Sequence, residues 1–210
     1  MNNWQKYNLH VNDWDSLVKI KFIENTGHGT FCDVGACNGV MTSFFKDLAG
    51  NEGMVYSFEL NPYNYNNIKH LASNNCIMEN MGVSDSPGVV SIYSDNTNPG
   101  NHISNIIGHD TAFRQMNIIG EIKSTSLDDY FDGKDINYIK IDVEGAELKV
   151  INGGLKTISK SKYCLIECHF QDQWGKIAQT LNDNGLHFNN LLDDSPITPD
   201  NYCYQIYRKN

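Results

Sequence analysis

Short apolar runs alternate along the chain with segments in which apolar residues recur every three or four positions. A short apolar run fits a buried strand, and the longer spacing fits one face of an amphipathic helix. The runs predict strands over residues 30–35, 54–60, 76–83, 136–142, 163–168, 186–192 and 202–207. The helical spacing predicts helices over residues 13–24, 39–49, 62–73, 127–131, 145–153 and 173–184. This alternation predicts one α/β domain over residues 1–210, with a doubly wound, mostly parallel sheet and helices on both faces.

Residues 89–94 and 121–125 are expected to pair as a hairpin beside the main sheet. The segment between them, residues 95–120, is polar and has no regular apolar spacing. A loop of this length in a compact domain is usually functional or mobile. We therefore expect residues 95–120 to form most of a lid over a substrate pocket, with His102 and His109 as possible lining residues.

A glycine turn follows the first predicted strand. The strand ends in Asp33-Val34-Gly35, and Gly39 precedes the next helix. Glycines at these positions let the backbone turn tightly and approach a ligand closely. A strand, a glycine turn and a helix N-terminus in this order favour a nucleotide-like ligand at the end of a parallel sheet. The spacing is G-x-x-x-G, so two of the three glycines of the dinucleotide-binding fingerprint are missing.

An acidic residue ends the second predicted strand. Glu59 lies 20 residues beyond Gly39, which is the position from which a carboxylate can accept both hydroxyls of a bound ribose. The alternative is that Glu59 is a solvated loop residue and that the glycines only make a turn. Asn61 and Pro62 follow, and they are read as the N-cap and first residue of a helix.

Four motifs resemble the FkbM family of class I S-adenosylmethionine-dependent methyltransferases. They are D-x-G-x-x-x-G from Asp33, F-E-L-N-P from Phe58, S-L-D-D-Y from Ser126 and K-I-D-V-E-G-A-E from Lys140. The resemblance covers roughly residues 30–169. It implies a Rossmann-like fold with seven strands, the last of them antiparallel, and S-adenosylmethionine as cofactor with S-adenosylhomocysteine as product. It also implies O-methylation, often of a hydroxyl on a sugar or small natural product.

The resemblance also implies a set of cofactor-binding residues. The methionine part of the cofactor would lie against the glycine turn, the ribose against Glu59, and the adenine against the end of the third strand. Asp85 has an alternative role as a turn residue ahead of Pro87-Gly88. The expected cofactor-binding residues are Asp33, Gly35, Ala36, Asn38, Gly39, Glu59, Leu60, Asn61, Asn80, Ser84, Asp85 and Asp142.

Three residues at strand ends are candidates for catalysis. His169 is the best candidate for a general base, because a histidine ordinarily titrates near neutral pH and this one follows the fifth strand. Asp142 and Glu167 end the fourth and fifth strands, and Asp142 could instead bind the N-terminus of the next helix. Together with Glu144, these residues also offer oxygen and nitrogen ligands for Mg²⁺ or Ca²⁺, but their spacing does not establish a metal site.

Composition limits the function classes. The chain has 210 residues and a formal net charge of −9, which argues against broad nucleic-acid binding. We find no apolar stretch long enough for a membrane span and no pattern of a secretion signal. The six cysteines form no C-x-x-C pair, so we expect free thiols and a cytoplasmic location.

The acceptor and the oligomeric state stay open. The rival functions are an NAD-dependent oxidoreductase and a cofactor-binding protein without turnover.

Overall fold

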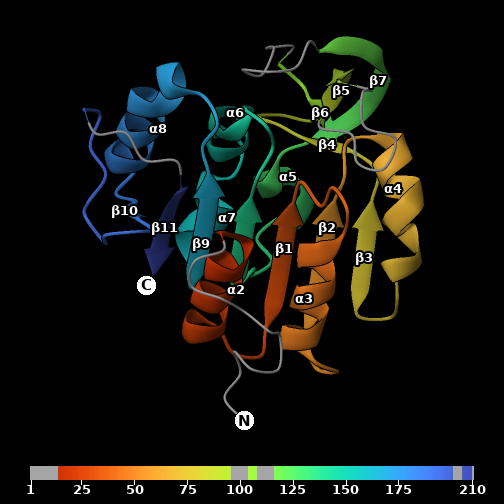
Figure 1. The fold of residues 1–210 in the computed structure, drawn as a ribbon, viewed down its shortest axis with the longest axis horizontal. Helices are drawn as coiled ribbons and strands as arrows, with labels where there is room; N and C mark the ends of the chain where they lie inside the picture. Colours follow the sequence, from red (N-terminus) through yellow and green to blue (C-terminus); the bar gives the residue numbers. More distant parts are fainter. Residues whose placement is uncertain (1–13, 96–103, 108–115, 201–204, 210) are drawn as a thin grey trace.

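A seven-stranded sheet forms the centre of the protein, and helices cover both of its faces (Figure 1). The structure is a computed structural model, and it describes residues 14–95, 104–107, 116–200 and 205–209. The strand order is β10-β11-β9-β8-β1-β2-β3. The strands of this sheet are β1 (Thr30–Val34), β2 (Met54–Phe58), β3 (Cys76–Glu79), β8 (Tyr138–Ile141), β9 (Tyr163–Glu167), β10 (Asn189–Asn190) and β11 (Gln205–Lys209).

Most neighbouring strands of this sheet are parallel. β1 pairs in parallel with β2 and β8, β2 pairs in parallel with β3, and β8 pairs in parallel with β9. β11 runs antiparallel to β9 and to β10. The buried apolar residues form two clusters. Successive residues of β1 pack into different clusters, since Phe31 belongs to one and Cys32 to the other. The predicted fold, a mostly parallel sheet with an antiparallel last strand and helices on both faces, is therefore confirmed.

A second, four-stranded sheet lies beside the main one. Its order is β4-β7-β5-β6, with β4 (Gly82–Val83), β5 (Gly88–Ser94), β6 (Ser104–Asn105) and β7 (Asn117–Thr125). The antiparallel pairing of β5 with β7 confirms the predicted hairpin. The predicted strand 76–83 is wrong in its extent, because Gly82 and Val83 leave the main sheet and pair with β7. The predicted loop 95–120 also contains β6 and the start of β7.

The helices follow the predicted positions with two differences. They are α2 (Trp14–Asn25), α3 (Val40–Ala49), α4 (Pro62–Ile68) continued by the short 3₁₀ helix η1 (Lys69–Leu71), α5 (Leu127–Phe131), α6 (Glu147–Asn152), α7 (Leu155–Lys160) and α8 (Gln171–Asp183). The side chain of Asn61 accepts a hydrogen bond from the Tyr63 N–H, and Ser126 caps α5 in the same way. Helix α7 was not predicted, and α8 begins two residues earlier than the predicted start at residue 173.

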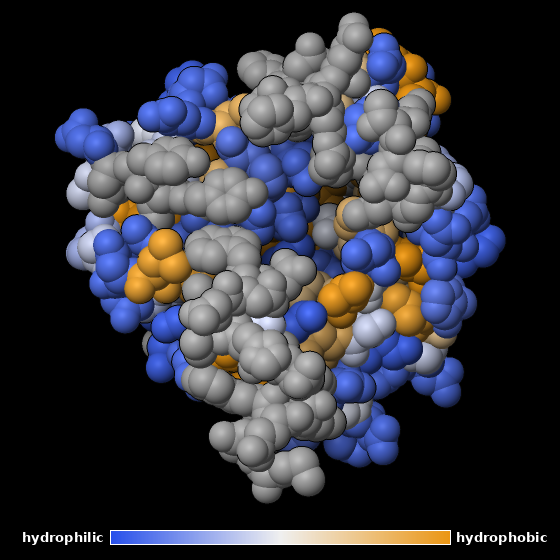
Figure 2. All heavy atoms as spheres, in the orientation of Figure 1, coloured by the Kyte–Doolittle hydropathy of each residue, from blue (hydrophilic) through white to orange (hydrophobic). Residues whose placement is uncertain are grey.

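On the face shown in Figure 2, the described surface is mostly hydrophilic, and its hydrophobic residues are scattered. None of the described helices combines the length and the apolar character needed to cross a bilayer. The described cysteines, Cys32, Cys37, Cys76, Cys164 and Cys168, form no disulfide bond. Cys203, His102 and His109 lie outside the described residues.

Candidate functional site

A pocket lies at the carboxyl ends of β1, β2 and β8. It holds about 620 Å³ of empty space, part of which is open to solvent. Strand ends and loops of the main sheet form most of its wall, and β4 and β6 of the second sheet complete it. The lining residues are Val34, Gly35, Cys37, Phe58, Leu60, Met81, Gly82, Val83, Ser104, Asn105, Ile106, Asp142, Val143, Glu144 and Ala146. Ligands of open parallel sheets bind at this edge, so the pocket is the candidate site.

Gly35 is required where the first strand turns into the pocket wall. Its φ of +88° is strained for residues with a side chain, and a Cβ atom there would lie 1.8 Å from the carbonyl oxygen of Asp142. The backbones of β1 and β8 therefore approach each other at the pocket as only a glycine permits. This geometry explains the glycine that directly follows the apolar run.

The Glu59 side chain accepts hydrogen bonds from both the glycine turn and the N-cap of α4. Its Oε2 atom accepts a hydrogen bond of 2.7 Å from the Cys37 N–H, and its Oε1 atom accepts one of 2.8 Å from the Asn61 N–H. Burial raises the pKa of Glu59 to about 7. The two hydrogen bonds lower this pKa, but their effect is smaller than that of burial. Glu59 is 4% exposed, so it is not the solvated loop acid of the alternative interpretation.

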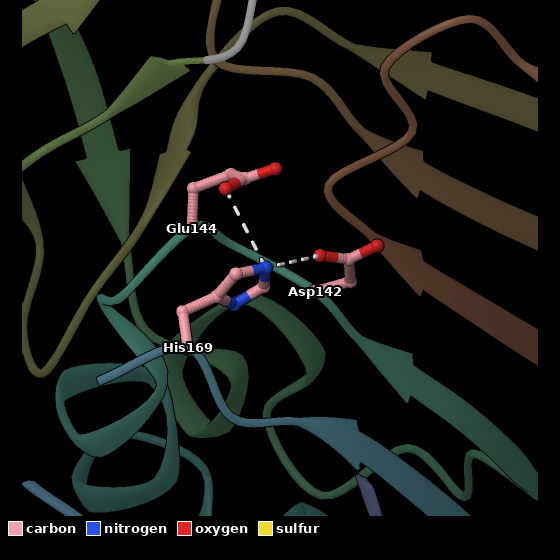
Figure 3. Close-up of side chains that lie close together, drawn as sticks. All are labelled: Asp142, Glu144 and His169. Atoms are coloured by element: carbon pink, nitrogen blue, oxygen red, sulfur yellow. Dashed lines mark ion pairs between the residues drawn. The ribbon is translucent and has the colours of Figure 1, made fainter. Parts of the chain in front are cut away.

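His169 lies among four carboxylates just past the end of β9. Figure 3 shows two of them, Asp142 and Glu144. The Nε2 atom of His169 is 3.4 Å from Glu144 Oε2, and it is 3.7 Å from both Asp142 Oδ1 and Glu167 Oε1. Its Nδ1 atom lies 2.8 Å from Oε1 of the buried Glu147. The structure thus brings the three candidate catalytic residues together, and Asp142 and Glu144 also line the pocket.

The carboxylates change the protonation of His169. Burial alone would lower the pKa of His169, but the hydrogen bond with Glu147 and the charges of Glu144 and Asp142 raise it to about 9. Burial raises the pKa of Glu144 to about 7, although His169 opposes this. The expected role of His169 as a general base depends on a pKa near neutrality. His169 does not have such a pKa, because its imidazole holds its proton at neutral pH.

A tight turn after β8 builds this cluster. Glu144 and Gly145 both have left-handed backbone conformations, with φ of +54° and +104°. A Cβ atom at Gly145 would lie 1.8 Å from the ring of Phe170, so a glycine is needed here. The Gly145 N–H donates to Glu147 Oε1 at 2.9 Å, which is the same oxygen that meets His169. The turn therefore positions Asp142, Glu144 and Glu147 together.

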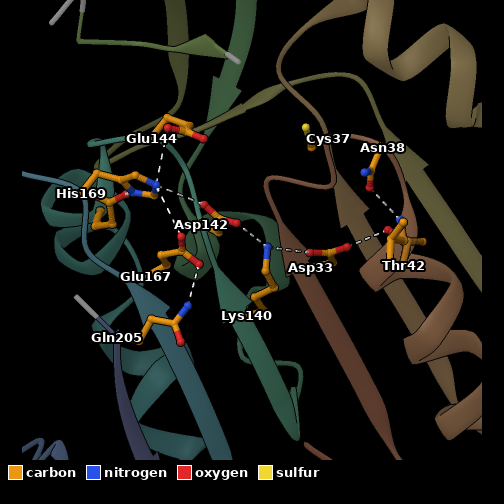
Figure 4. Close-up of polar contacts among 12 residues, drawn as sticks. Asp33, Cys37, Asn38, Thr42, Lys140, Asp142, Glu144, Glu167, His169 and Gln205 are labelled. Carbon is orange, nitrogen blue, oxygen red and sulfur yellow. Dashed lines mark hydrogen bonds and ion pairs between the residues drawn. The ribbon is translucent and has the colours of Figure 1, made fainter. Parts of the chain in front are cut away.

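A chain of polar contacts runs from Asp142 through Lys140 and Asp33 to Thr42 (Figure 4). Lys140 Nζ lies 3.0 Å from Asp142 Oδ2 and 3.8 Å from Asp33 Oδ1. Asp33 Oδ2 accepts a hydrogen bond of 2.7 Å from Thr42 Oγ1, which in turn lies 2.7 Å from Ser57 Oγ. Burial alone would lower the pKa of Lys140, but Asp142 and Asp33 raise it above its usual range.

The predicted cofactor residues fall into four groups. Gly35, Leu60 and Asp142 line the pocket, whereas Asp33 is fully buried inside β1. Ala36, Asn38, Gly39, Glu59 and Asn61 belong to the glycine turn or the adjoining strand end and do not line the pocket. Asn80, Ser84 and Asp85 also lie off the pocket wall. The cofactor role of these residues stays a prediction.

The contacts of the residues near the adenine position are local. The Asn80 side chain donates to the backbone oxygens of Glu59 and Leu60. Ser84 donates to Asp85, whose carboxylate forms an ion pair of 3.5 Å with Lys149. The Asp85 side chain is 47% exposed, which agrees with its alternative role in the turn before Pro87-Gly88.

Several residues of the site were missed by the sequence analysis. They are Cys37 in the pocket wall, Glu147 against His169, and Lys140 beside Asp142. Lys140 had a signal in the sequence, since a lysine inside an apolar strand must find a buried partner. The others depend on contacts between distant segments.

Asp142, Glu144 and His169 also satisfy the spacing of a possible cation site. One ligand atom from each lies within 4.8 Å of the other two. Mg²⁺ and Ca²⁺ prefer oxygen ligands, whereas the nitrogen of a protonated imidazole cannot bind a metal. A metal at this cluster stays a prediction.

Comparison with known proteins identifies the family. The model of the methyltransferase FkbM domain matches residues 33–188, and no curated protein matches the chain. A solved methyltransferase FkbM from Methylobacillus flagellatus KT is 16% identical with a TM-score of 0.57, and the match covers 86% of this chain but only 43% of that one. A putative rRNA-methylase from Clostridium thermocellum is 10% identical with a TM-score of 0.51, and the match covers 95% of both chains. These two likenesses support the fold, and the domain match shows that the chain belongs to the methyltransferase FkbM family.

Proposed function

We propose that the protein is an S-adenosylmethionine-dependent O-methyltransferase that acts on a hydroxyl of a sugar or small natural product. The observation that carries this proposal is the juxtaposition of the pocket with the His169 cluster. Asp142 and Glu144 belong to both, because they line the pocket and face His169 Nε2. Groups that exchange protons therefore lie beside a pocket at the ligand-binding edge of the sheet.

The lining of the pocket supports S-adenosylmethionine as the ligand. Gly35 lines the pocket, and Phe58, Leu60 and Val83 offer apolar wall for an adenosine. S-adenosylmethionine supplies an activated methyl group on a sulfonium and carries an ammonium. The carboxylates of Asp142 and Glu144 would attract these positive charges, and Glu59, behind the glycine turn, is proposed for the ribose hydroxyls.

The cluster of His169 can remove a proton from an acceptor hydroxyl. Glu147 holds the ring through Nδ1, so Nε2 is directed toward the carboxylates of the pocket. Glu144 has a pKa of about 7 because of burial, so its carboxylate can accept a proton near neutral pH. We propose that Glu144 takes up the proton and that His169, already an imidazolium, holds the Glu144 carboxylate in place, with Asp142 and Glu167 stabilising the imidazolium.

The acceptor is proposed to enter beside the second sheet. Ser104, Asn105 and Ile106 lie within the predicted lid segment and line the pocket, which supports a lid role for residues 95–120. Residues 96–103 and 108–115 lie outside the described part of the chain. The formal net charge of −9 disfavours an RNA acceptor, and the described cysteines, which form no disulfide bond, support a cytoplasmic location.

The proposal is tested by turnover. Purified protein with S-adenosylmethionine and a panel of sugars, phenols and short RNAs should methylate a hydroxyl compound. We expect His169→Ala to lose about 10²-fold or more in rate while S-adenosylhomocysteine still binds, and His187→Ala, at an exposed histidine, to keep the activity. Methylation of RNA alone, or of amines alone, would contradict the proposed acceptor class.

Three alternatives give different outcomes in the same experiments. A cofactor-binding protein without turnover would bind S-adenosylhomocysteine but methylate nothing in the panel. An NAD-dependent oxidoreductase would bind NAD⁺ instead. A metal-assisted enzyme would bind Mg²⁺ or Ca²⁺ in a calorimetric titration, lose that binding in the Glu144→Gln variant, and lose turnover when a chelator is added.

A further inference from the structure

Lys140 is a buried cation in the middle of β8, and its side chain is only 7% exposed. Its neighbours on the strand, Ile139 and Ile141, enter the apolar core. The register places Lys140 opposite Asp33 of β1. A lysine is almost never fully buried unless it is paired, so the partners of this ammonium define what it does.

Two carboxylates compete for Lys140, and the distances rank them. The Nζ atom lies 3.0 Å from Asp142 Oδ2, which is a normal charge-assisted hydrogen bond, but 3.8 Å from Asp33 Oδ1, which is not. Asp33 has its own donor in Thr42, at 2.7 Å. The closer interaction of Lys140 is therefore with the residue of the pocket wall rather than with the one inside β1.

The two oxygens of Asp142 have different roles. Oδ2 is held by Lys140, while Oδ1 lies on the side of His169, at 3.7 Å from its Nε2 atom (Figure 4). A carboxylate that is bound through one oxygen loses most of its rotational freedom. The other oxygen is then fixed beside the imidazole at the edge of the pocket.

We propose that Lys140 is a positioning residue, which fixes the Asp142 carboxylate between the pocket and His169. This inference rests on the proposed function, because it assigns Asp142 to the site where cofactor and acceptor meet. Lys140 touches neither ligand in this account and acts only through Asp142. The competing explanation is that Lys140 merely neutralises Asp33 within the sheet.

A double-mutant cycle separates the two explanations. S-adenosylhomocysteine is titrated by calorimetry into the wild type, Lys140→Met, Asp142→Asn and the double variant, with the exposed Lys156→Met as control. We expect Lys140→Met to weaken binding about tenfold, and to weaken it less than about twofold once Asp142 is already Asn. An equal loss in both backgrounds, or no loss in either, would overturn the proposal.

In Lys140→Met the buried carboxylate of Asp33 loses its neighbouring cation, which could stop the variant from folding. Asp33→Asn removes this buried charge, so the double-mutant cycle is repeated in the Asp33→Asn protein. Crystal structures of Asp33→Asn with and without Lys140→Met give a readout that needs no ligand. We expect the Asp142 carboxylate to leave its place beside His169 only when Lys140 is absent. An unmoved Asp142, or a wild-type crystal structure in which Lys140 contacts Asp33 alone, would overturn the proposal. If the wild type fails to bind S-adenosylhomocysteine, the proposed function fails, and these structures still decide the role of Lys140.

Discussion

The Nδ1 atom of His169 lies 2.8 Å from Oε1 of Glu147, a carboxylate that is only 1% exposed. The same oxygen of Glu147 accepts a hydrogen bond from the Gly145 N–H. The backbone therefore fixes the Glu147 carboxylate independently of its contact with the imidazole. A fixed, buried carboxylate orients the imidazole and favours its charged form. The orientation and the protonation of His169 therefore have a common cause.

The first prediction concerns that pair. Glu147→Gln keeps the shape of the side chain but removes its charge, so the pKa of His169 should fall from about 9 by about one unit or more. A side-chain NMR titration measures it, and the exposed His187 serves as an internal control. A His169 pKa that stays the same in the variant would show that Glu147 does not set the protonation.

The second prediction is that the protein loses stability as the pH rises from 4.5 to 9. Glu59 and Glu144 have folded-state pKa values of about 7, above their ordinary 4.5, so the folded state holds more protons between these pH values. His169 extends the effect, because its pKa is raised from 6.5 to about 9. Folded-state proton uptake is stabilising at low pH, and the stabilisation disappears as each group titrates.

Urea unfolding across this pH range measures the effect. The free energy of unfolding should decrease steadily, by on the order of 3 kcal/mol for His169 alone. The His169→Gln variant should flatten the curve between pH 6.5 and 9. A wild-type stability that increases over this upper range would contradict the raised pKa.

The third prediction concerns the glycine at the pocket wall. In Gly35→Ala the new Cβ atom would lie 1.8 Å from the Asp142 carbonyl oxygen, so β1 and β8 must separate. Gly133 is a matched control, because it also has a positive φ, +82°, but its Cβ would meet no described atom within 4 Å. Gly133→Ala should cost only the backbone strain, about 1 kcal/mol, whereas Gly35→Ala should cost more than about 3 kcal/mol. Equal losses in thermal unfolding would show that the close approach is unimportant.

The fourth prediction concerns Glu59. Its carboxylate accepts hydrogen bonds from Cys37 and Asn61 and is proposed to contact the ribose. Glu59→Ala should weaken S-adenosylhomocysteine binding by about 1–3 kcal/mol, measured by calorimetry. The exposed Glu121→Ala is the control for lost negative charge. Unchanged binding in a folded Glu59→Ala protein would remove Glu59 from the cofactor site.

Local sequence signals were enough to predict the main sheet and the glycine turn. Asn61-Pro62 marks the start of α4, and Gly50 follows the last residue of α3. Each of these depends on residues close in sequence. The extent of the third strand was not predictable in this way, because Gly82 and Val83 leave the main sheet only through their pairing with Ser124 and Thr125.

The chemistry of the site was only partly predictable. The ends of β8 and β9 indicated Asp142, Glu167 and His169, since parallel strands end at the same edge. The raised pKa of His169 depends on Glu147, which lies 22 residues away in the chain. Lys140 and Asp142 are two positions apart at the end of β8, and positions with this spacing share one face of an extended strand, so their contact was predictable from the sequence.

The central claim is that the pocket binds S-adenosylmethionine, and one calorimetric titration tests it most directly. Purified protein is titrated with S-adenosylhomocysteine, with NAD⁺ as the comparison ligand. The account predicts binding of S-adenosylhomocysteine with a Kd of about 1–100 μM, corresponding to roughly 5–8 kcal/mol, and no binding of NAD⁺. Binding of NAD⁺ alone, or of neither ligand, would contradict the claim and leave the family and the fold as the only conclusions.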